Sequence, residues 1–140
     1  MDKFENYFRY LVAAIGTGIT WLFGTWDIAI ITLTIFVGLD YFLGVLRAFV
    51  NKEVSSSIGA KGIAKKAVIF IVLIVAVLLD RLLNTGSWVF RTLVAYFYIC
   101  NEGISILENG ASLGVPMPPR LKEVLLQLKE GEKKEIKEAK

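Results

Sequence analysis

The chain has 140 residues and a mean hydropathy of +0.58, and its 55% of hydrophobic residues exceeds the roughly 45–50% of soluble domains. It contains no His and one Cys, which excludes a His-based catalytic dyad and argues against a disulfide framework or a metal site. Because the apolar residues form blocks and the charges lie in gaps and tails, we expect an all-α membrane protein that is not an enzyme and needs no cofactor. The net charge of +3 fits the cytoplasmic bias of Lys and Arg in membrane proteins, so no nucleic-acid partner is expected.

Residues 8–24 form the first apolar block and predict a membrane span, which needs about 17–25 residues. The Gly and Thr residues of this block make it the weakest of four candidates, so a helix lying flat in the membrane interface is the alternative. Aromatic residues at both ends are typical of the membrane–water interface. Ala14 and Gly18, one helical turn apart, offer a face for close packing against another helix.

Three further apolar blocks predict spans over residues 28–47, 66–83 and 88–108. The loop over residues 47–66 carries five basic residues and one acidic residue, which predicts a cytoplasmic location, and its Ser and Gly residues, including Gly59 and Gly62, indicate flexibility. Gly44 and Ala48 form a second pair of small residues, and ordinary packing within the chain is the alternative role of both pairs. Cys100, in the fourth block, is expected to be an ordinary buried or lipid-facing small residue.

Four spans with a cytoplasmic second loop place both termini in the cytoplasm. Residues 1–115 then form the transmembrane domain, and residues 116–140 form a cytoplasmic segment. The stretch GVPMPP ends the fourth span, and apolar residues at helical spacing follow it, which predicts an amphipathic helix ahead of a charged tail. We expect this helix to bind the inner membrane surface or an adjacent subunit. Its binding residues would be Arg120, Leu121, Lys122, Val124, Leu125 and Leu128.

Several charged residues fall inside the predicted spans, where each costs at least about 2.5–3.5 kcal/mol on insertion scales, so partners or water are expected. Asp40 and Glu102 lie at similar depth near the cytoplasmic side, where two lysines open the third span. We therefore predict a polar cluster that joins helices or lines a pore. Its members are Asp40, Lys65, Lys66, Asn101 and Glu102. On the outer side Asp80 is expected to pair with Arg91; alternatively, the outer charges simply lie at the interface and reach water.

Two stretches carry a resemblance to a known family. The first is LDYFLGVLRA at residues 39–48, followed by Ser56, Ser57, Gly59, Gly62 and Lys66. The second is NEGISILEN at residues 101–109, followed by GVPMPPRLKEVL at residues 114–125. In these stretches the chain resembles bacteriophage holins of the toxin-secretion/phage-lysis family, which includes holin-like proteins encoded beside large clostridial toxins.

The resemblance implies a small protein of the bacterial cytoplasmic membrane that accumulates there and then self-assembles into large pores. Such pores release an endolysin that cuts peptidoglycan and lyses the host, or assist toxin export, so the endolysin or toxin is a functional partner without stable binding. The direct partners are the lipid bilayer and further copies of the chain. The runner-up is a selective small ion channel, or a membrane adaptor that binds a soluble partner through residues 118–140. An intramembrane protease or a carrier is a weaker alternative, because no supporting motif or internal repeat accompanies the carboxylates of Asp40 and Glu102.

Overall fold

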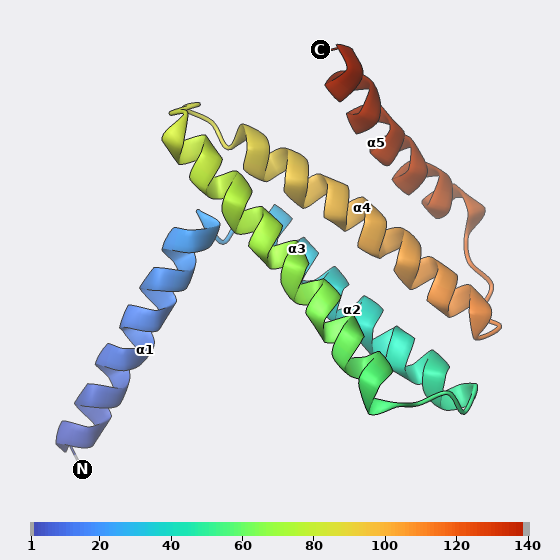
Figure 1. Cartoon of the computed structure of the whole chain (residues 1–140), viewed down its shortest axis with the longest axis horizontal. Helices are drawn as coiled ribbons and strands as arrows, with labels where there is room; N and C mark the ends of the chain where they lie inside the picture. Colours follow the sequence, from blue (N-terminus) through green and yellow to red (C-terminus); the bar gives the residue numbers. More distant parts are fainter. Residues whose placement is uncertain (1, 139–140) are drawn as a thin grey trace.

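The computed structural model describes residues 2–138, with the side chains of residues 2–130. The described residues form five α-helices and no strands, which confirms the all-α expectation. In chain order the helices are α1 (Asp2–Phe23), α2 (Ile28–Val50), α3 (Ser56–Leu82), α4 (Val89–Ser112) and α5 (Pro119–Glu138) (Figure 1). The four apolar blocks of the sequence correspond to α1–α4, and the predicted amphipathic segment corresponds to α5.

Helices α2, α3 and α4 run side by side in alternating directions and form a three-helix bundle (Figure 1). One end of the bundle holds the links over residues 51–55 and 113–118, and is called the inner end below. The other end holds the links over residues 24–27 and 83–88, and is called the outer end. These names follow the cytoplasmic location that the sequence predicts for the link between α2 and α3.

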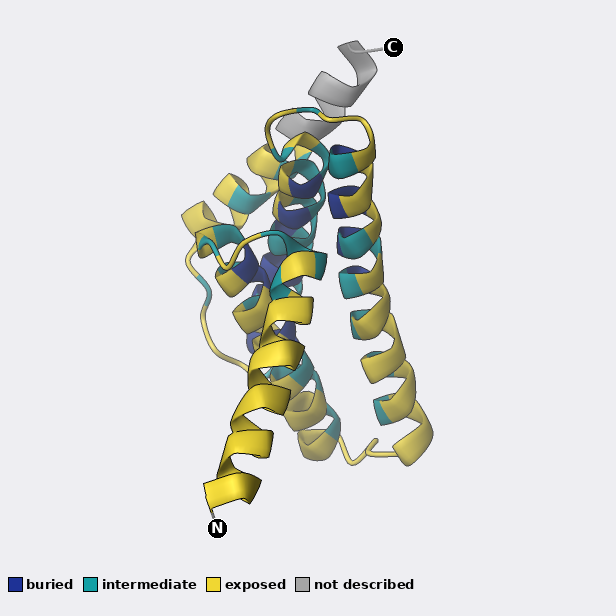
Figure 2. Ribbon diagram, turned by 90° about the vertical axis from the view of Figure 1, so that its left-hand side faces the viewer, coloured by how far each residue is buried: buried dark blue, intermediate teal, exposed yellow. Residues whose placement is uncertain are grey.

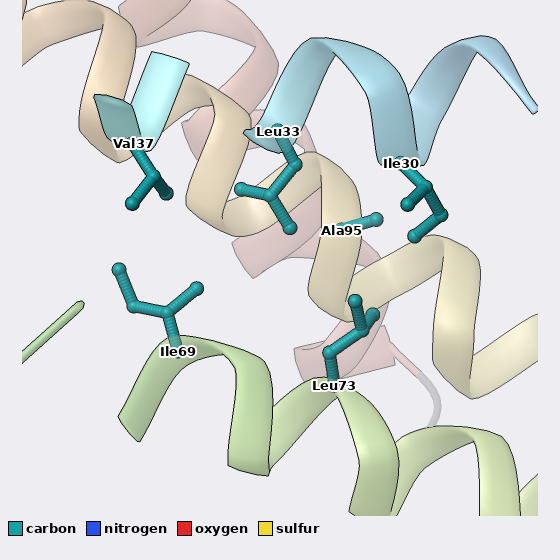
Figure 3. Packing of buried hydrophobic residues seen from close by; sticks show 6 residues of the cluster. All are labelled: Ile30, Leu33, Val37, Ile69, Leu73 and Ala95. Carbon is teal, nitrogen blue, oxygen red and sulfur yellow. The ribbon is translucent and has the colours of Figure 1, made fainter. Parts of the chain in front are cut away.

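The bundle core lies where the three helices meet, and the side chains of α2 point toward those of α3 beside Ala95 of α4 (Figure 3). Its buried members are Ile30, Leu33, Val37, Ile69, Leu73 and Ala95. Their spacing of three or four residues along α2 and α3 is that of one helix face. Ala95 is fully buried, and its small side chain lets α4 approach the other two helices closely.

Among the described helices, α2 and α3 are long and apolar enough to cross a membrane. Only a minor part of each is buried inside the chain, and large apolar side chains such as Ile35, Phe42, Ile71 and Val75 are exposed (Figure 2). A soluble protein buries most of such a helix in its core. The outward apolar faces of α2 and α3 are therefore suited to contact with lipid.

The link between α2 and α3 is shorter than the loop expected over residues 47–66. Ser55 caps α3, and its side chain accepts a hydrogen bond of 3.2 Å from the backbone N–H of Ile58, so the helix begins at Ser56. Gly59 and Gly62, which suggested a flexible loop, lie in the first turns of α3 beneath the ring of Tyr41. Because glycine has no side chain, the tyrosine ring can lie directly against the helix, so here the glycines allow packing rather than disorder.

Helix α1 leaves the bundle at the outer end and runs across the direction of the bundle axis (Figure 1). None of its residues is buried, and it contacts α3 mainly near its C-terminal end. Gly24, with a φ of 86°, allows the tight link that turns the chain into α2, where the side chain of Asp27 caps the new helix through Ile30. The direction of α1 is thus set by a few residues at the outer end.

Helix α5 folds back along α4 instead of extending away from the bundle (Figure 1). It begins at Pro119, in the first turn where proline is favoured. Leu125 packs against Gly103, where an added Cβ would lie 3.1 Å from its side chain. Lys129 donates a hydrogen bond of 2.6 Å to Asn101, two residues earlier on α4. The C-terminal segment therefore has a docking surface within its own chain.

Candidate functional site

The ammonium of Lys66 joins α2, α3 and α4 in the inner half of the bundle, close to its middle. Its Nζ lies 2.5 Å from a carboxylate oxygen of Asp40 on α2, and it also donates a hydrogen bond to the carboxylate of Glu102 on α4. The side chains of both acids are 8% exposed and that of Lys66 is 20% exposed. One lysine thus bridges two nearly buried carboxylates from the two neighbouring helices.

Two further polar side chains extend this contact into what we call the inner network: Asp40, Arg47, Lys66, Glu102 and Asn109. The amide nitrogen of Asn109 donates a hydrogen bond of 3.0 Å to Asp40, and Arg47 donates one of 3.3 Å to the amide oxygen of Asn109. The sequence reasoning missed both added residues. A usable signal was present, because Arg47 follows Asp40, and Asn109 follows Glu102, by seven residues, which is two helical turns on one face.

The inner network contains three of the five residues predicted for the polar cluster. Lys65 is exposed and stays outside it. Asn101 faces α5, where it accepts the hydrogen bond from Lys129. The periodicity of a helix explains both differences, because an adjacent residue points about 100° away around the axis.

A cavity of about 330 Å³ opens beside the inner network, between α2 and α3. Its lining includes the charged groups of Asp40 and Lys66 together with Gly44 and Ala48, the second pair of small residues. Among the residues whose side chains are described, none fills the space above Gly44, where an added Cβ would meet nothing within 4 Å. The first pair is also uncovered, since Ala14 is exposed and Gly18 has open space around it. Ala14, Gly18 and Gly44 are therefore free of close packing against the rest of the described chain, whereas Ala48 is half-buried at the edge of the cavity.

A second polar site is built at the outer end around Arg91, which is 1% exposed. Its guanidinium donates hydrogen bonds to both carboxylate oxygens of Asp27, at 2.8 and 3.2 Å, and to the backbone carbonyl oxygens of Phe23 and Thr25. The hydrogen bond from Arg91 lowers the pKa of Asp27, and burial opposes that shift. Arg91 thereby fastens the link between α1 and α2 to the start of α4.

Asp80 does not form the side-chain ion pair with Arg91 that we expected from the sequence. Its carboxylate instead accepts hydrogen bonds from the backbone N–H groups of Phe90 and Arg91, at 3.0 and 2.8 Å, and from the hydroxyl of Thr85. The first N–H groups of a helix lack partners within the helix, so Asp80 caps α4 from the end of α3. The guanidinium is left to bind Asp27, a residue that the sequence analysis did not consider.

The residues predicted to form a binding helix lie on α5. Of the six, Leu125 is half-buried against α4, whereas Arg120, Leu121, Lys122, Val124 and Leu128 are exposed. Lys122 also lies 4.0 Å from Glu108 of α4, in a contact that is exposed on both sides. The larger part of this surface is thus available to another molecule or to a membrane.

Cys100 is buried in α4, as expected.

The known proteins that are similar to this chain include one family and several individual relatives. The model of the bacteriophage holin family matches residues 17–130. A protein of 14.9 kDa from the nagH 3′ region of Clostridium perfringens, of uncharacterised function, is 56% identical over 128 residues, which cover 91% of this chain and 97% of the relative. An uncharacterised Listeria monocytogenes protein is 37% identical over 133 residues, or 94% of each chain. A probable holin of Bacillus phage phi105 is 40% identical over 81 residues, covering 57% of this chain and 58% of the phage protein. No solved structure matches significantly.

Proposed function

Because this chain belongs to the bacteriophage holin family, we propose that it acts as a holin in the cytoplasmic membrane of a bacterium. In this proposal the protein accumulates as separate copies, assembles with itself and opens pores wide enough for folded proteins. The pores release an endolysin and cause lysis, or assist the export of a toxin. Membership of the family and the two membrane-compatible helices support a membrane location and a role that is not enzymatic.

We propose that α2, α3 and α4 cross the membrane, with the inner end in the cytoplasm. The basic residues around the link between α2 and α3 support this orientation, because Lys and Arg are enriched in cytoplasmic loops. All three tryptophans, Trp21, Trp26 and Trp88, lie at or next to the outer end, and tryptophan favours the membrane–water interface. The direction of α1 across the bundle axis supports a location along the outer surface rather than a fourth span (Figure 1).

The observation that carries the proposal of a pore is the position of α5 beside α4. Asn101 lies eleven residues before Ser112 at the end of α4, or about 16 Å along the helix at 1.5 Å per residue. Lys129 of α5 reaches that depth, which is roughly half of the 30 Å hydrocarbon core. Glu130 is exposed beside it, whereas the exposed charges of Arg120, Lys122 and Glu123 lie in the first two turns of α5, near the inner end.

Lys129 and Glu130 are unfavourable in lipid at this depth, since each charge there costs about 2.5–3.5 kcal/mol or more. If α4 crosses the membrane, the surface of α4 against which α5 packs must therefore face water. A pore enclosed by several copies supplies such a side, with α5 next to the lumen and the apolar faces of α2 and α3 toward lipid. In separate copies, α5 would instead remain at the inner membrane surface until assembly provides the lumen.

The inner network suits the stage before assembly. It pairs the charges of α2, α3 and α4 with one another, so that few of them contact lipid while copies accumulate. The adjoining cavity, with its small residues Gly44 and Ala48, leaves a surface on which a helix of another copy can approach closely. Self-association thus has a structural basis at the inner end.

Expression in a bacterium, with and without a coexpressed endolysin, tests the proposal. We expect abrupt lysis when both proteins are present, and leakage of a folded cytoplasmic enzyme across the inner membrane when this protein is expressed alone. A variant ending at Pro119, which lacks α5, should insert but release less of the enzyme. Steady growth with selective ion flux would contradict the pore and support a small channel. The lack of any membrane effect would support an adaptor.

A further inference from the structure

Arg81, at the outer end of α3, lacks the ionic partner that its buried neighbour Arg91 has. Its guanidinium lies 4.4 Å from the ring centre of Trp21 and 5.6 Å from that of Trp88. The Nη1 atom is buried and has no hydrogen-bond partner among the described residues. Within the same part of the chain Arg81 forms no ion pair. Two aromatic rings thus flank a guanidinium group in which one buried N–H donor is unsatisfied.

The carboxylates at the outer end already have hydrogen-bond partners other than Arg81. Asp27 binds the guanidinium of Arg91, and Asp80 accepts hydrogen bonds from the start of α4 and from Thr85. Two aspartates and two arginines therefore lie at this end, but among the described residues only Arg91 is paired, with Asp27. Arg81 is the positive charge at this end that remains without a counter-charge.

Hollows on two sides of Arg81 leave room for a ligand. One, of about 270 Å³, is bounded by Arg81, Trp88, the polar link between α3 and α4, and Asp80, whose carboxylate already accepts hydrogen bonds from Thr85 and from the start of α4. The residues contributed by that link are Asn84, Thr85, Gly86 and Ser87. The other hollow is wider and more open, and runs along small residues of α1, including Gly16 and Thr20. A polar recess and a shallow groove thus meet at one guanidinium group.

We propose that Arg81 binds the phosphate of an anionic lipid headgroup at the outer membrane surface. Guanidinium groups match phosphate oxygens with paired hydrogen bonds, and the flanking tryptophans belong to the layer in which lipid phosphates lie. The headgroup occupies the recess beside Ser87, and the groove along α1 accommodates the start of an acyl chain. The inference rests on the proposed placement of the outer end at a membrane surface, and it does not depend on pore formation.

Intrinsic fluorescence tests this site directly, because two of the three tryptophans of the chain stack on Arg81. The purified full chain in neutral detergent is titrated with short-chain phosphatidylglycerol, with zwitterionic phosphatidylcholine and with inorganic phosphate. We expect a saturable change with phosphatidylglycerol at concentrations at least roughly tenfold below those needed for phosphatidylcholine, the effect of about one charge-assisted hydrogen bond. Saturation by inorganic phosphate at similar concentrations would overturn the assignment to lipid in favour of a soluble anion.

The variant Arg81→Gln should lose the response, and Arg81→Lys should retain part of it because the charge remains. Arg9→Gln, which removes an exposed arginine of α1, is the matched control and should bind as the wild type does. Lipid retained through purification, measured by mass spectrometry, provides a readout that does not depend on tryptophan packing, and it should fall in Arg81→Gln but not in Arg9→Gln. A similar loss in Arg9→Gln, or lipid retention unaffected in Arg81→Gln, overturns the proposal. If the protein causes lysis but shows no saturable fluorescence change with phosphatidylglycerol, only the proposed lipid site is refuted.

Discussion

Lys66 of α3 lies 2.5 Å from Asp40 of α2, and the same ammonium also bonds Glu102 of α4. A single side chain therefore sets the relative positions of three helices close to their middles. Because the two carboxylates are almost completely buried, too little water reaches them to solvate their charges in place of Lys66. The inner network is thus the part of the bundle in which one substitution should have the largest effect on stability.

Replacing Lys66 with Met keeps most of the side-chain length but leaves Asp40 and Glu102 facing each other without a counter-charge. Removing one partner of a buried ion pair destabilises proteins by about 3–5 kcal/mol, and partial exposure of Lys66 places the expected loss near the lower value. Thermal unfolding of the purified protein in mild detergent measures it. The matched control is Lys65→Met, an exposed neighbour that should change stability by no more than about 0.5 kcal/mol. Equal effects of the two substitutions would show that the network does not hold the helices.

Exchanging the charges of Asp40 and Lys66 tests their direct contact. Asp40→Lys alone brings two ammonium groups together and should prevent accumulation in the membrane. The double variant Asp40→Lys with Lys66→Asp restores one oppositely charged pair between α2 and α3, so accumulation should recover in part. Immunoblots of membrane fractions measure the result. A double variant no better than the two single ones would argue against the pairing.

The contact between Asp27 and Arg91 should make a small pH-dependent contribution to stability. Since Arg91 lowers the pKa of Asp27 in the folded protein, the contribution is complete above the ordinary range of aspartate and is lost as the pH falls through the lowered value. Asp27→Asn isolates the charge, because asparagine caps helices about as well as aspartate. The wild type should unfold at a higher temperature than this variant at neutral pH, and the difference should vanish in acid. The side chain of Asp27 is 42% exposed, so solvent screens the effect. A difference that grows in acid would contradict this account.

Docking of α5 should depend on the small size of Gly103. An added Cβ would lie 3.1 Å from Leu125 and 3.2 Å from Phe36, so Gly103→Ala should loosen α5. A cysteine at position 129 should then react faster with a water-soluble maleimide than it does in the Lys129→Cys parent. Gly38→Ala is the control, since an added Cβ on this residue of α2 meets nothing within 4 Å. This change should leave the labelling rate the same, and equal acceleration by both would mean that helix packing at Gly103 is unimportant.

The direction of α1 predicts where the N-terminus lies. If α1 follows the outer surface, a cysteine replacing Asp2 should react with an impermeant reagent in intact spheroplasts. Ser57→Cys, at the inner end, should be labelled only after the membrane is opened. The wild type provides the background, because its Cys100 is buried. Protection of the residue-2 cysteine in intact spheroplasts would instead establish the four-span arrangement with both termini in the cytoplasm.

Much of the helical architecture could be predicted, because hydrophobic blocks and helix-ending residues are local signals. The segment that follows GVPMPP was expected to be a helix, and α5 indeed begins at Pro119. The long loop predicted before the third block was wrong, because its Ser and Gly residues were interpreted as flexible, whereas α3 already begins at Ser56. Their role became visible only with Tyr41 lying over Gly59 and Gly62, a contact between helices that the local sequence does not encode.

The polar contacts were predictable only in outline. Depth along each span indicated that Asp40, Glu102 and a lysine should meet, because charges at one level of a bundle need partners. Depth does not say which way a side chain points around its helix, so Lys65 and Asn101 were included while Arg47 and Asn109 were missed. The same limit applies at the outer end, where Asp80 and Asp27 lie at similar levels. There the partner of Arg91 was decided by the unsatisfied N–H groups of α4, which bind Asp80.

The sequence by itself determined that this protein is helical and that its apolar faces suit a membrane, since composition and periodicity fix these properties along the chain. The motifs at residues 39–48 and 101–109 carry the resemblance to holins. Only the tertiary structure decided which charges pair, where α1 points and that α5 returns along α4. These features depend on the rotation of each helix about its axis and on contacts between distant residues, such as Gly103 with Leu125. Packing of whole helices, rather than any local preference, selects among them.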